Sequence, residues 1–286
     1  MKISTEIASI ARITGEEKAV ELCAEAGFDA WDFSMFSMCK YDRVNDCLLS
    51  NDHPLAGKDY LAFARKLKKI GLDNGIVCNQ SHAPFPTSAP CIASYLKRAI
   101  ECTAEAGGEI CIIHPMNNGT PEENKEMYLS LLPFAKDCNV KIATENMWNW
   151  DDEKGHSSFA ACATPKSFCE HIDVVGDNFF GACLDIGHAE MKGSDTSAAE
   201  LIRALNKRLI ALHIHDNDKL HDSHQIPFSM DIDFTEMVKA LKEIGYNGYL
   251  TLEAEQYLKT SGYTGDNALK GVKELAYSAR KIADMF

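Results

Sequence analysis

The chain has 286 residues, of which 45% are hydrophobic, and a formal net charge of −13. This apolar content is enough for a large core, so we expect residues 1–286 to form one domain. The negative charge would repel a phosphate backbone, and we therefore do not expect nucleic acid as a partner.

The sequence carries no sign of membrane or secretory targeting. Its first residues contain no long apolar stretch, and no apolar run approaches the ~20 residues that span a bilayer. The 11 cysteines are scattered singly without a C-x-x-C pair, as in reduced proteins. These features predict a cytoplasmic protein without a membrane partner, and they leave a homo-oligomer open.

Taken in chain order, eight short apolar or β-branched runs alternate with longer segments of helical period. The predicted strands are residues 2–6, 29–33, 75–80, 109–114, 140–145, 180–185, 209–215 and 249–253. The predicted helices are residues 15–26, 58–71, 89–107, 121–138, 164–175, 196–207, 233–245 and 266–285. Threonine–proline pairs at 120–121 and 164–165 mark helix starts, and the expected C-terminal caps are Gly27, Gly71, Gly107 and Gly245.

Eight strand–helix units predict an α/β protein that folds as a single (β/α)₈ TIM barrel. No glycine-rich phosphate loop of the G-x-G-x-x-G or G-x-x-x-x-G-K-[ST] type is present, which argues against an open nucleotide-binding sheet. Two connections, residues 34–57 and 219–231, are longer than their strands require. Both follow strand C-termini, so we interpret them as candidate pocket walls, with plain surface insertion as the alternative.

Ionisable residues close most of the predicted strands. They are His82, His114, Glu145, Asp185, His213, His215 and Glu253. A buried charge needs a partner or a metal, and the C-terminal ends of barrel strands lie at one end of the barrel. Because side chains alternate along a strand, Glu145, Asp185 and Glu253 should converge on the barrel axis together with the histidines. The sequence thus predicts a divalent metal site.

The donor types limit the choice of metal. Carboxylate oxygens with one imidazole suit Mn²⁺, Mg²⁺, Co²⁺ or Zn²⁺, and further histidines favour zinc. Three more residues extend the predicted cluster: His188 follows Asp185 by three positions, and Asp222 and His224 form a D-x-H pair in the loop after the seventh strand.

At these residues the sequence resembles the xylose isomerase-like TIM barrel superfamily, which includes sugar phosphate isomerases and epimerases and the endonuclease IV (family 2 AP endonuclease) branch. The resemblance covers essentially the whole chain. The segments that carry it are TENM (144–147), LDIGH (184–188), HIHDND (213–218), DSH (222–224) and LTLE (250–253), supported by SHAPF (81–85) and IIHP (112–115).

The epimerase-like members imply that Glu145, Asp185, His215 and Glu253 hold one metal ion and that the two glutamates also act as acid and base. His188 would then contact a substrate oxygen. We prefer His215 because His-Asp-Asn-Asp matches the family's His-x-Lys/Asn-Asp step, with His213 as the alternative. The endonuclease IV-like members imply three zinc ions on a larger set: His82, His114, Glu145, Asp185, His188, His215, Asp222, His224 and Glu253.

Two departures from the family pattern affect the prediction of the substrate. Sugar 3-epimerases have an arginine soon after the metal histidine, where this chain offers only Lys219, a candidate substrate contact. Endonuclease IV needs a basic rim that faces DNA, which an acidic chain is poorly placed to supply.

The resemblance therefore favours a divalent-metal-dependent isomerase or epimerase of a sugar or sugar phosphate, acting through a metal-stabilised enediolate. The alternatives are a trinuclear zinc phosphodiesterase of the endonuclease IV type and a metal- or sugar-binding barrel without catalysis. The expected partner is a small sugar-derived molecule. Aromatic side chains could cover its apolar face, and the candidates are Trp31, Phe33, Trp148 and Trp150.

Overall fold

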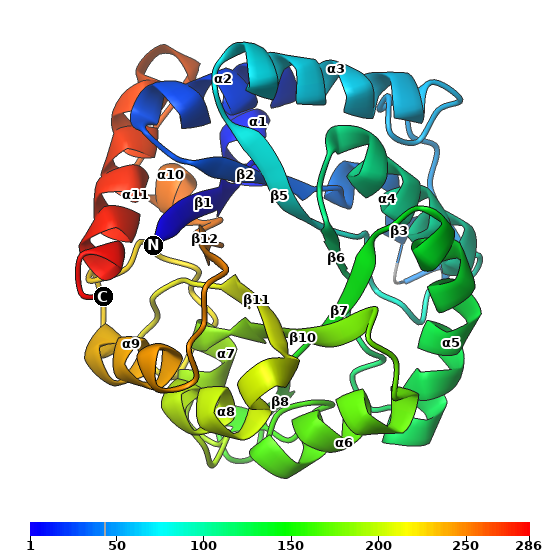
Figure 1. Ribbon diagram of the computed structural model, residues 1–286, viewed down its shortest axis with the longest axis vertical. Coiled ribbons are helices and arrows are strands. Elements are labelled where there is room, and N and C mark those ends of the chain that lie inside the picture. Colours follow the sequence, from blue (N-terminus) through cyan, green and yellow to red (C-terminus); the bar gives the residue numbers. More distant parts are fainter. Residues whose placement is uncertain (43) are drawn as a thin grey trace.

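The computed structural model describes residues 1–42 and 44–286 and shows a ring of strands surrounded by helices (Figure 1). The parallel sheet has the strand order β11-β10-β7-β6-β5-β2-β1-β12. Its strands are β1 (Lys2–Glu6), β2 (Ala30–Ser34), β5 (Val77–His82), β6 (Ile110–Ile112), β7 (Lys141–Glu145), β10 (Phe180–Asp185), β11 (Leu209–His213) and β12 (Tyr249–Leu252). The two ends of the sheet meet where Ile214 bridges Leu252 in parallel. The predicted (β/α)₈ barrel is confirmed.

Helices cover the outside of the sheet. They are α1 (Ala8–Thr14), α2 (Glu16–Ala26), α3 (Tyr60–Asp73), α4 (Ile92–Ala106), α5 (Pro121–Asp137), α6 (Pro165–Val175), α7 (Ile186–Glu190), α8 (Ala198–Leu205), α9 (Phe234–Glu243), α10 (Tyr257–Thr260) and α11 (Ala268–Ala283). The short helices α1, α7 and α10 were not predicted. Nor were two small hairpins, β3 (Tyr41–Asp42) with β4 (Cys47–Leu48) and β8 (Asn149–Asp151) with β9 (His156–Ser158). Among the described helices, none combines the length and apolarity of a membrane span.

Local signals explain several helix ends. The Thr120 side chain accepts a hydrogen bond from Glu123 N while the Glu123 carboxylate accepts one from Thr120 N, which is a capping box at the start of α5. Gly27 ends α2 with a φ of 94°, a conformation that costs glycine little. The prediction that Gly71 caps α3 was wrong, because the helix continues to Asp73. Gly71 instead allows close packing, since a Cβ there would lie 3.0 Å from both Ile76 O and Trp31 Nε1.

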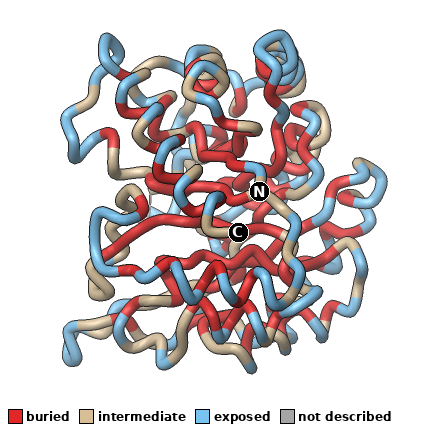
Figure 2. The backbone as a smooth tube through the Cα atoms, turned by 60° about the vertical axis from the view of Figure 1, so that its left-hand side comes forward, coloured by how far each residue is buried: buried red, intermediate tan, exposed pale blue. Residues whose placement is uncertain are grey.

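The main apolar core lies between the sheet and the helices, and the buried part of the chain is concentrated along the central strands (Figure 2). Trp31 and Phe33 belong to this core and are fully buried, with their rings in edge contact. They pack on the outside of β2, and the hypothesis that they wall a substrate pocket was wrong.

Two kinds of side chain fill the inside of the barrel. One half contains a small apolar cluster with one residue from each of four neighbouring strands: Ile112, Ala143, Cys183 and Ala211. The other half is polar and hydrogen-bonded, and it includes Ser4, Asn79, Gln80 and Thr251. Two residues beyond the apolar cluster, the same inward alternation reaches His114, Glu145, Asp185 and His213. The small apolar layer therefore supports a layer of ionisable groups at the barrel mouth.

Candidate metal centre

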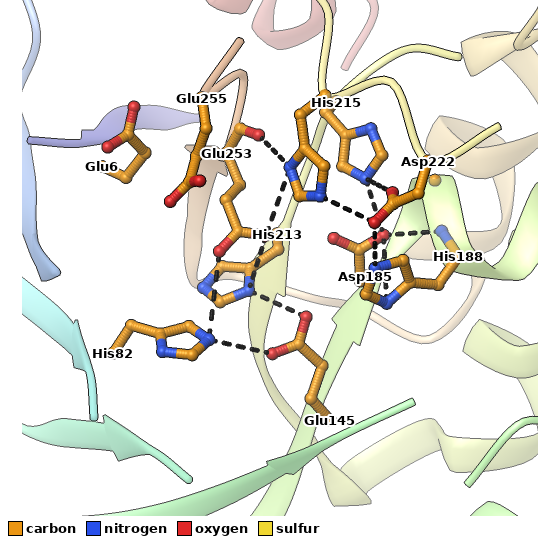
Figure 3. A network of polar contacts seen from close by, with 12 residues as sticks. Glu6, His82, Glu145, Asp185, His188, His213, His215, Asp222, Glu253 and Glu255 are labelled. Carbon is orange, nitrogen blue, oxygen red and sulfur yellow. Dashed lines mark hydrogen bonds and ion pairs between the residues drawn. The ribbon is translucent and has the colours of Figure 1, made fainter. Parts of the chain in front are cut away.

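Four ionisable side chains meet near the barrel axis, and we call Glu145, Asp185, His213 and Glu253 the axis set. Their donor atoms all lie within 4.8 Å of one another, and all four residues are buried. His213 Nδ1 lies 3.1 Å from Glu145 Oε1 and 3.5 Å from Glu253 Oε2 (Figure 3).

The structure places His213, and not the preferred His215, in the axis set. In the register between β10 and β11, Asp185 is the direct partner of His213. His213 therefore lies at the height of Asp185, while His215 is two residues further along and points into the next layer. His215 also reaches the axis set, because its Nε2 lies 3.2 Å from Asp185 Oδ1, and the choice between the two histidines stays a prediction.

A second group lies above the axis set and consists of His188, His215, Asp222 and His224, which we call the loop set. Asp222 is at its centre. Its Oδ1 lies 3.4 Å from His215 Nε2, and its Oδ2 lies 3.4 Å from His188 Nε2 and 3.1 Å from His224 Nε2. The rings of His215 and His224 stack with centroids 3.9 Å apart.

Backbone carbonyls orient all three histidines of the loop set. The Nδ1 atoms of His188, His215 and His224 lie 2.8, 3.3 and 2.8 Å from the carbonyl oxygens of Asn146, Asp216 and Glu253. A carbonyl can only accept, so each Nδ1 carries a proton and Nε2 is the nitrogen that would face a cation. All three Nε2 atoms face Asp222. This is the arrangement that metal-ligating imidazoles adopt.

A third group joins His82 and His114 to Glu145. The two Nε2 atoms lie 2.8 Å apart, and Glu145 Oε2 is 3.6 Å from His82 and 3.3 Å from His114. His82 Nδ1 donates to Ala83 O, so Nε2 is the nitrogen that faces His114 and Glu145. Glu145 thus belongs to this group and to the axis set, and it could bridge two ions.

Several ligand atoms are buried without a hydrogen bond. They are Glu145 Oε2, Asp185 Oδ2, His215 Nε2 and Asp222 Oδ1. An orphaned buried polar atom costs about 1–3 kcal/mol, and more when it is charged. These four atoms point into the clusters of candidate ligands. A divalent cation in a cluster would give each of them a partner.

The electrostatics of Glu145, Asp185 and His114 agree with this fit. Burial alone would favour the neutral acid, but the neighbouring imidazoles of His213, His114 and His82 outweigh it and hold the pKa of Glu145 well below its usual range. In the same way burial is outweighed at Asp185, where His188 and His215 lower the pKa to about 2. Burial, with His82 close by, lowers the pKa of His114 to about 4, so this imidazole is neutral and able to bind a metal at neutral pH.

A cavity of about 950 Å³ opens above these groups. Its wall includes Phe36, Phe85, Trp148 and Trp150, and its floor includes Glu145 and Glu253. Trp148 Nε1 donates to Asp222 Oδ2 at 3.2 Å, which orients the indole beside the loop set. Within the described part of the chain, neither lysine nor arginine lines this cavity. Lys219 lies outside the lining and pairs with Glu190 at 3.5 Å, so the structure does not place it as a substrate contact.

Sequence reasoning missed other residues that shape the site. Glu6 ends β1 as the predicted ligands end their strands, and burial and the neighbouring Glu255 raise its pKa to about 7. Gly187 allows His215 to approach, since a Cβ there would lie 2.0 Å from the His215 ring. Asp216 binds the loop that follows it by accepting hydrogen bonds from the amides of Asn217, Ser229, Met230 and Ile232. Glu6 could have been found because it ends a predicted strand, as the predicted ligands do. No sequence signal marked Gly187 or Asp216.

Comparisons with known proteins agree with the fold. A family model described as xylose isomerase-like TIM barrel matches residues 20–278. An uncharacterized protein of Methanocaldococcus jannaschii is 28% identical over 255 residues, which cover 82% of this chain and 78% of the relative. An inosose dehydratase of Clostridium perfringens is 27% identical over 143 residues, 44% of each chain.

Solved structures of the same fold include an epimerase-like protein and a zinc-bound protein. A D-tagatose 3-epimerase-like protein superimposes with a TM-score of 0.69 at 22% identity, over 99% of both chains. The IolI protein with a bound zinc atom superimposes with a TM-score of 0.72 at 18% identity, over 100% of this chain and 99% of the other. At these identities the likeness establishes the fold.

We predict that Gly187→Ala disrupts the loop set. The new methyl group would overlap the His215 ring, which is fully buried and stacked on His224 and so has no free space to enter. Overpacking of this kind costs about 1–3 kcal/mol in the free energy of unfolding. Urea unfolding and metal analysis should show lower stability and less bound metal. Gly57→Ala is the control, because its Cβ would contact only Pro54 O at 3.6 Å, and equal effects of the two variants would contradict the prediction.

We predict that chelation loosens part of the loop at 219–231. If Asp222 and His224 bind a cation, its removal should raise amide exchange in residues 219–224. Gln225 and Ile232 should stay protected, because Asp216 holds both through hydrogen bonds independent of metal. The double variant Asp222→Ala/His224→Ala should show the loosened pattern even with metal present.

His221→Ala is the matched control for that experiment, since His221 is an exposed histidine of the same loop and lies outside the loop set. It should respond to chelator as the wild type does. Identical exchange in all variants with and without chelator would mean that Asp222 and His224 are not ligands.

Proposed function

Because the chain belongs to the xylose isomerase-like TIM barrel family, we propose that it is a metal-dependent isomerase or epimerase of a small, uncharged sugar or sugar derivative. The observation that carries this proposal is the axis set, in which two glutamates, an aspartate and a histidine meet at the floor of a cavity of about 950 Å³. The solved sugar 3-epimerases and the partial relative described as inosose dehydratase support the same class of substrate.

The donor chemistry of the axis set suits Mn²⁺ or Zn²⁺, with Mg²⁺ and Co²⁺ as alternatives. Three carboxylates supply hard oxygens, and one imidazole adds borderline character. When bound, such a cation would polarise a substrate carbonyl and stabilise the negative charge that develops on its oxygen. The carbon next to that carbonyl then becomes acidic enough for a carboxylate to remove its proton.

Glu145 and Glu253 are the proposed acid and base. Both line the cavity, and both lie beside His213 Nδ1. One glutamate would remove a proton from carbon and the other would return one to the neighbouring atom or the opposite face. To act in this way a glutamate must keep one oxygen free of other bonds, and Glu145 Oε2 accepts no hydrogen bond.

The walls of the cavity indicate how a substrate would bind. Aromatic faces such as those of Trp148 and Phe36 pack well against the C–H face of a sugar ring. Asn117, Asn118 and Asn149 add neutral hydrogen-bonding groups. A phosphorylated substrate would normally meet lysine, arginine or a helix N-terminus, and the described lining supplies neither cationic side chain. This favours an uncharged substrate.

The loop set favours a structural metal ion. Catalytic zinc sites keep one coordination position open, whereas structural sites are closed by four protein ligands. Here His215 adds a fourth donor to His188, Asp222 and His224. A cation in this set would tie the loop after β11 to the end of β10 and would leave the chemistry to the axis set.

A phosphoester hydrolase is the second candidate, and one observation favours it: His82 and His114 add donors on the other side of Glu145, so that ions could bind side by side. Paired ions are common in enzymes that cleave phosphoesters. Against this candidate stand the closed loop set, the absence of cations in the described lining and the net charge of −13.

We predict that Glu145→Gln and Glu253→Gln each reduce the isomerisation rate by about 10²–10⁴-fold, because each removes a proton-transfer group. Solvent deuterium incorporation into candidate ketoses measures this step. Glu126→Gln is the control, since Glu126 is an exposed glutamate of the cavity rim outside the metal groups. Retention of more than about a tenth of the wild-type rate by either glutamate variant would be inconsistent with the two-glutamate mechanism.

We also predict negligible affinity for duplex DNA that contains an abasic site at physiological salt. The net negative charge opposes association with the phosphate backbone. Fluorescence anisotropy and gel analysis with zinc present would test binding and cleavage. Nanomolar binding or strand cleavage would overturn the isomerase proposal in favour of the hydrolase.

A further inference from the structure

Two tryptophans of the cavity wall follow Glu145 on the same segment of chain. Trp148 lies directly before β8 and Trp150 lies within it, and both side chains line the cavity. Side chains two residues apart on an extended strand share a face and lie about 7 Å apart. That separation is comparable with the length of one sugar ring. The segment therefore carries an aromatic surface from Glu145 on the cavity floor toward the rim.

The rim tryptophan is held in place by the protein. The Trp150 ring stacks on His221, with centroids 6.0 Å apart and an interplanar angle of 16°. The Asp218 carboxylate accepts a hydrogen bond from His221 N at 2.7 Å and lies 2.8 Å from His221 Nδ1. Across the hairpin, Trp150 pairs with Ser157, whose hydroxyl donates to Lys192 O at 2.8 Å. A surface that is fixed in advance loses little freedom when a ligand binds.

Trp150 nevertheless keeps much of its surface open. It is 42% exposed, and Phe85, which also lines the cavity, is 40% exposed. Tryptophan is highly buried on average, and exposed apolar surface with a polar surround marks a binding site. The aromatic groups proposed to cover the reacting sugar, Trp148 and Phe36, are half-buried. Trp150 is thus an aromatic face at the rim that the reacting unit does not account for.

The size of the cavity agrees with a ligand that reaches the rim. Its volume of about 950 Å³ is near the upper end of the range of about 300–1,000 Å³ that holds drug-sized molecules. A single hexose is smaller than such a molecule. A hexose that reacts over Glu145 and Glu253 would therefore leave the outer part of the cavity empty.

The outer lining also indicates the chemistry of a second unit. Ser88 Oγ forms no hydrogen bond with the described residues, and Asn118 uses Oδ1 to accept from Asn149 Nδ2 while its own Nδ2 has no partner among them. These groups can bind hydroxyl groups, and Trp150 can pack against a face of C–H groups. A sugar ring offers both, and the described lining has no lysine or arginine for an anionic group.

We propose that the substrate is a two-ring sugar: a ketose whose reacting carbons lie over Glu145 and Glu253 and which carries a second, uncharged sugar ring stacked on Trp150. This inference rests on the proposed function, because the floor groups must act on the first unit. It goes beyond that function by assigning the rim as a second binding position.

The test compares ligands that differ only in the second ring. Isomaltulose and maltulose carry a glucose ring on O6 and O4 of fructose, and the 6-O-methyl and 4-O-methyl ethers of fructose carry a methyl group on the same oxygens. Isothermal titration calorimetry of the full chain with Mn²⁺ measures the dissociation constants. We expect at least one disaccharide to bind about tenfold more tightly than its methyl ether, because Trp150 acts as an aromatic anchor.

Trp150→Ala should remove this preference, so that disaccharide and ether bind with about equal affinity. Trp150→Phe keeps an aromatic face and should retain part of the preference, which separates stacking from a change in the hairpin. Phe159→Ala is the matched control, because Phe159 follows the same hairpin, is 64% exposed and lies outside the cavity lining. It should show the wild-type preference.

Equal affinity of the wild type for each disaccharide and its ether would overturn the inference, as would a preference that survives Trp150→Ala. Either result leaves the proposed function standing if the ethers bind and incorporate solvent deuterium. Absence of binding and of deuterium incorporation with every one of these ketoses would overturn the proposed function itself.

Discussion

Carboxylates that are buried at the mouth of a barrel need positive charge within a few ångströms in order to stay ionised, and much of this molecule is built around that need. Glu145, Asp185, Asp222 and Glu253 lie in a region that excludes water from most of their surface. Histidines approach each of them. Protons on these imidazoles balance part of the charge, and divalent cations would balance it more completely while satisfying the orphaned oxygen atoms.

The donors are divided between two layers because the strands place them at different heights. Small apolar residues inside the barrel support the axis set, whose members end their strands directly above that layer. The loop set lies higher and depends on a segment that returns over the barrel, held by the amide hydrogen bonds of Asp216. Members of both layers line the cavity: Glu145 and Glu253 from the axis set, and His188, Asp222 and His224 from the loop set.

The orientation of the histidines follows from the same division. Where the backbone supplies a carbonyl, as for His188 and His224, it sets which nitrogen faces the metal without a further side chain. His213 is instead surrounded by carboxylates, with Glu145 Oε1 3.1 Å from its Nδ1 and Asp32 Oδ2 3.6 Å from its Nε2.

The barrel and the types of the candidate ligands could be predicted from the sequence alone. Alternation within a strand and the parallel direction of all strands are local properties, so His114, Glu145, Asp185 and Glu253 could be placed at one end of the barrel before any contact was known. Which of these donors lie close together depends on tertiary contacts. The register between β10 and β11 sets His213 beside Asp185, His215 also reaches Asp185, and the path of the loop brings Asp222 and His224 to His188. The same register and packing turn Trp31 into the core and Asp32 toward His213, because a shift of one residue reverses the face on which a strand side chain lies.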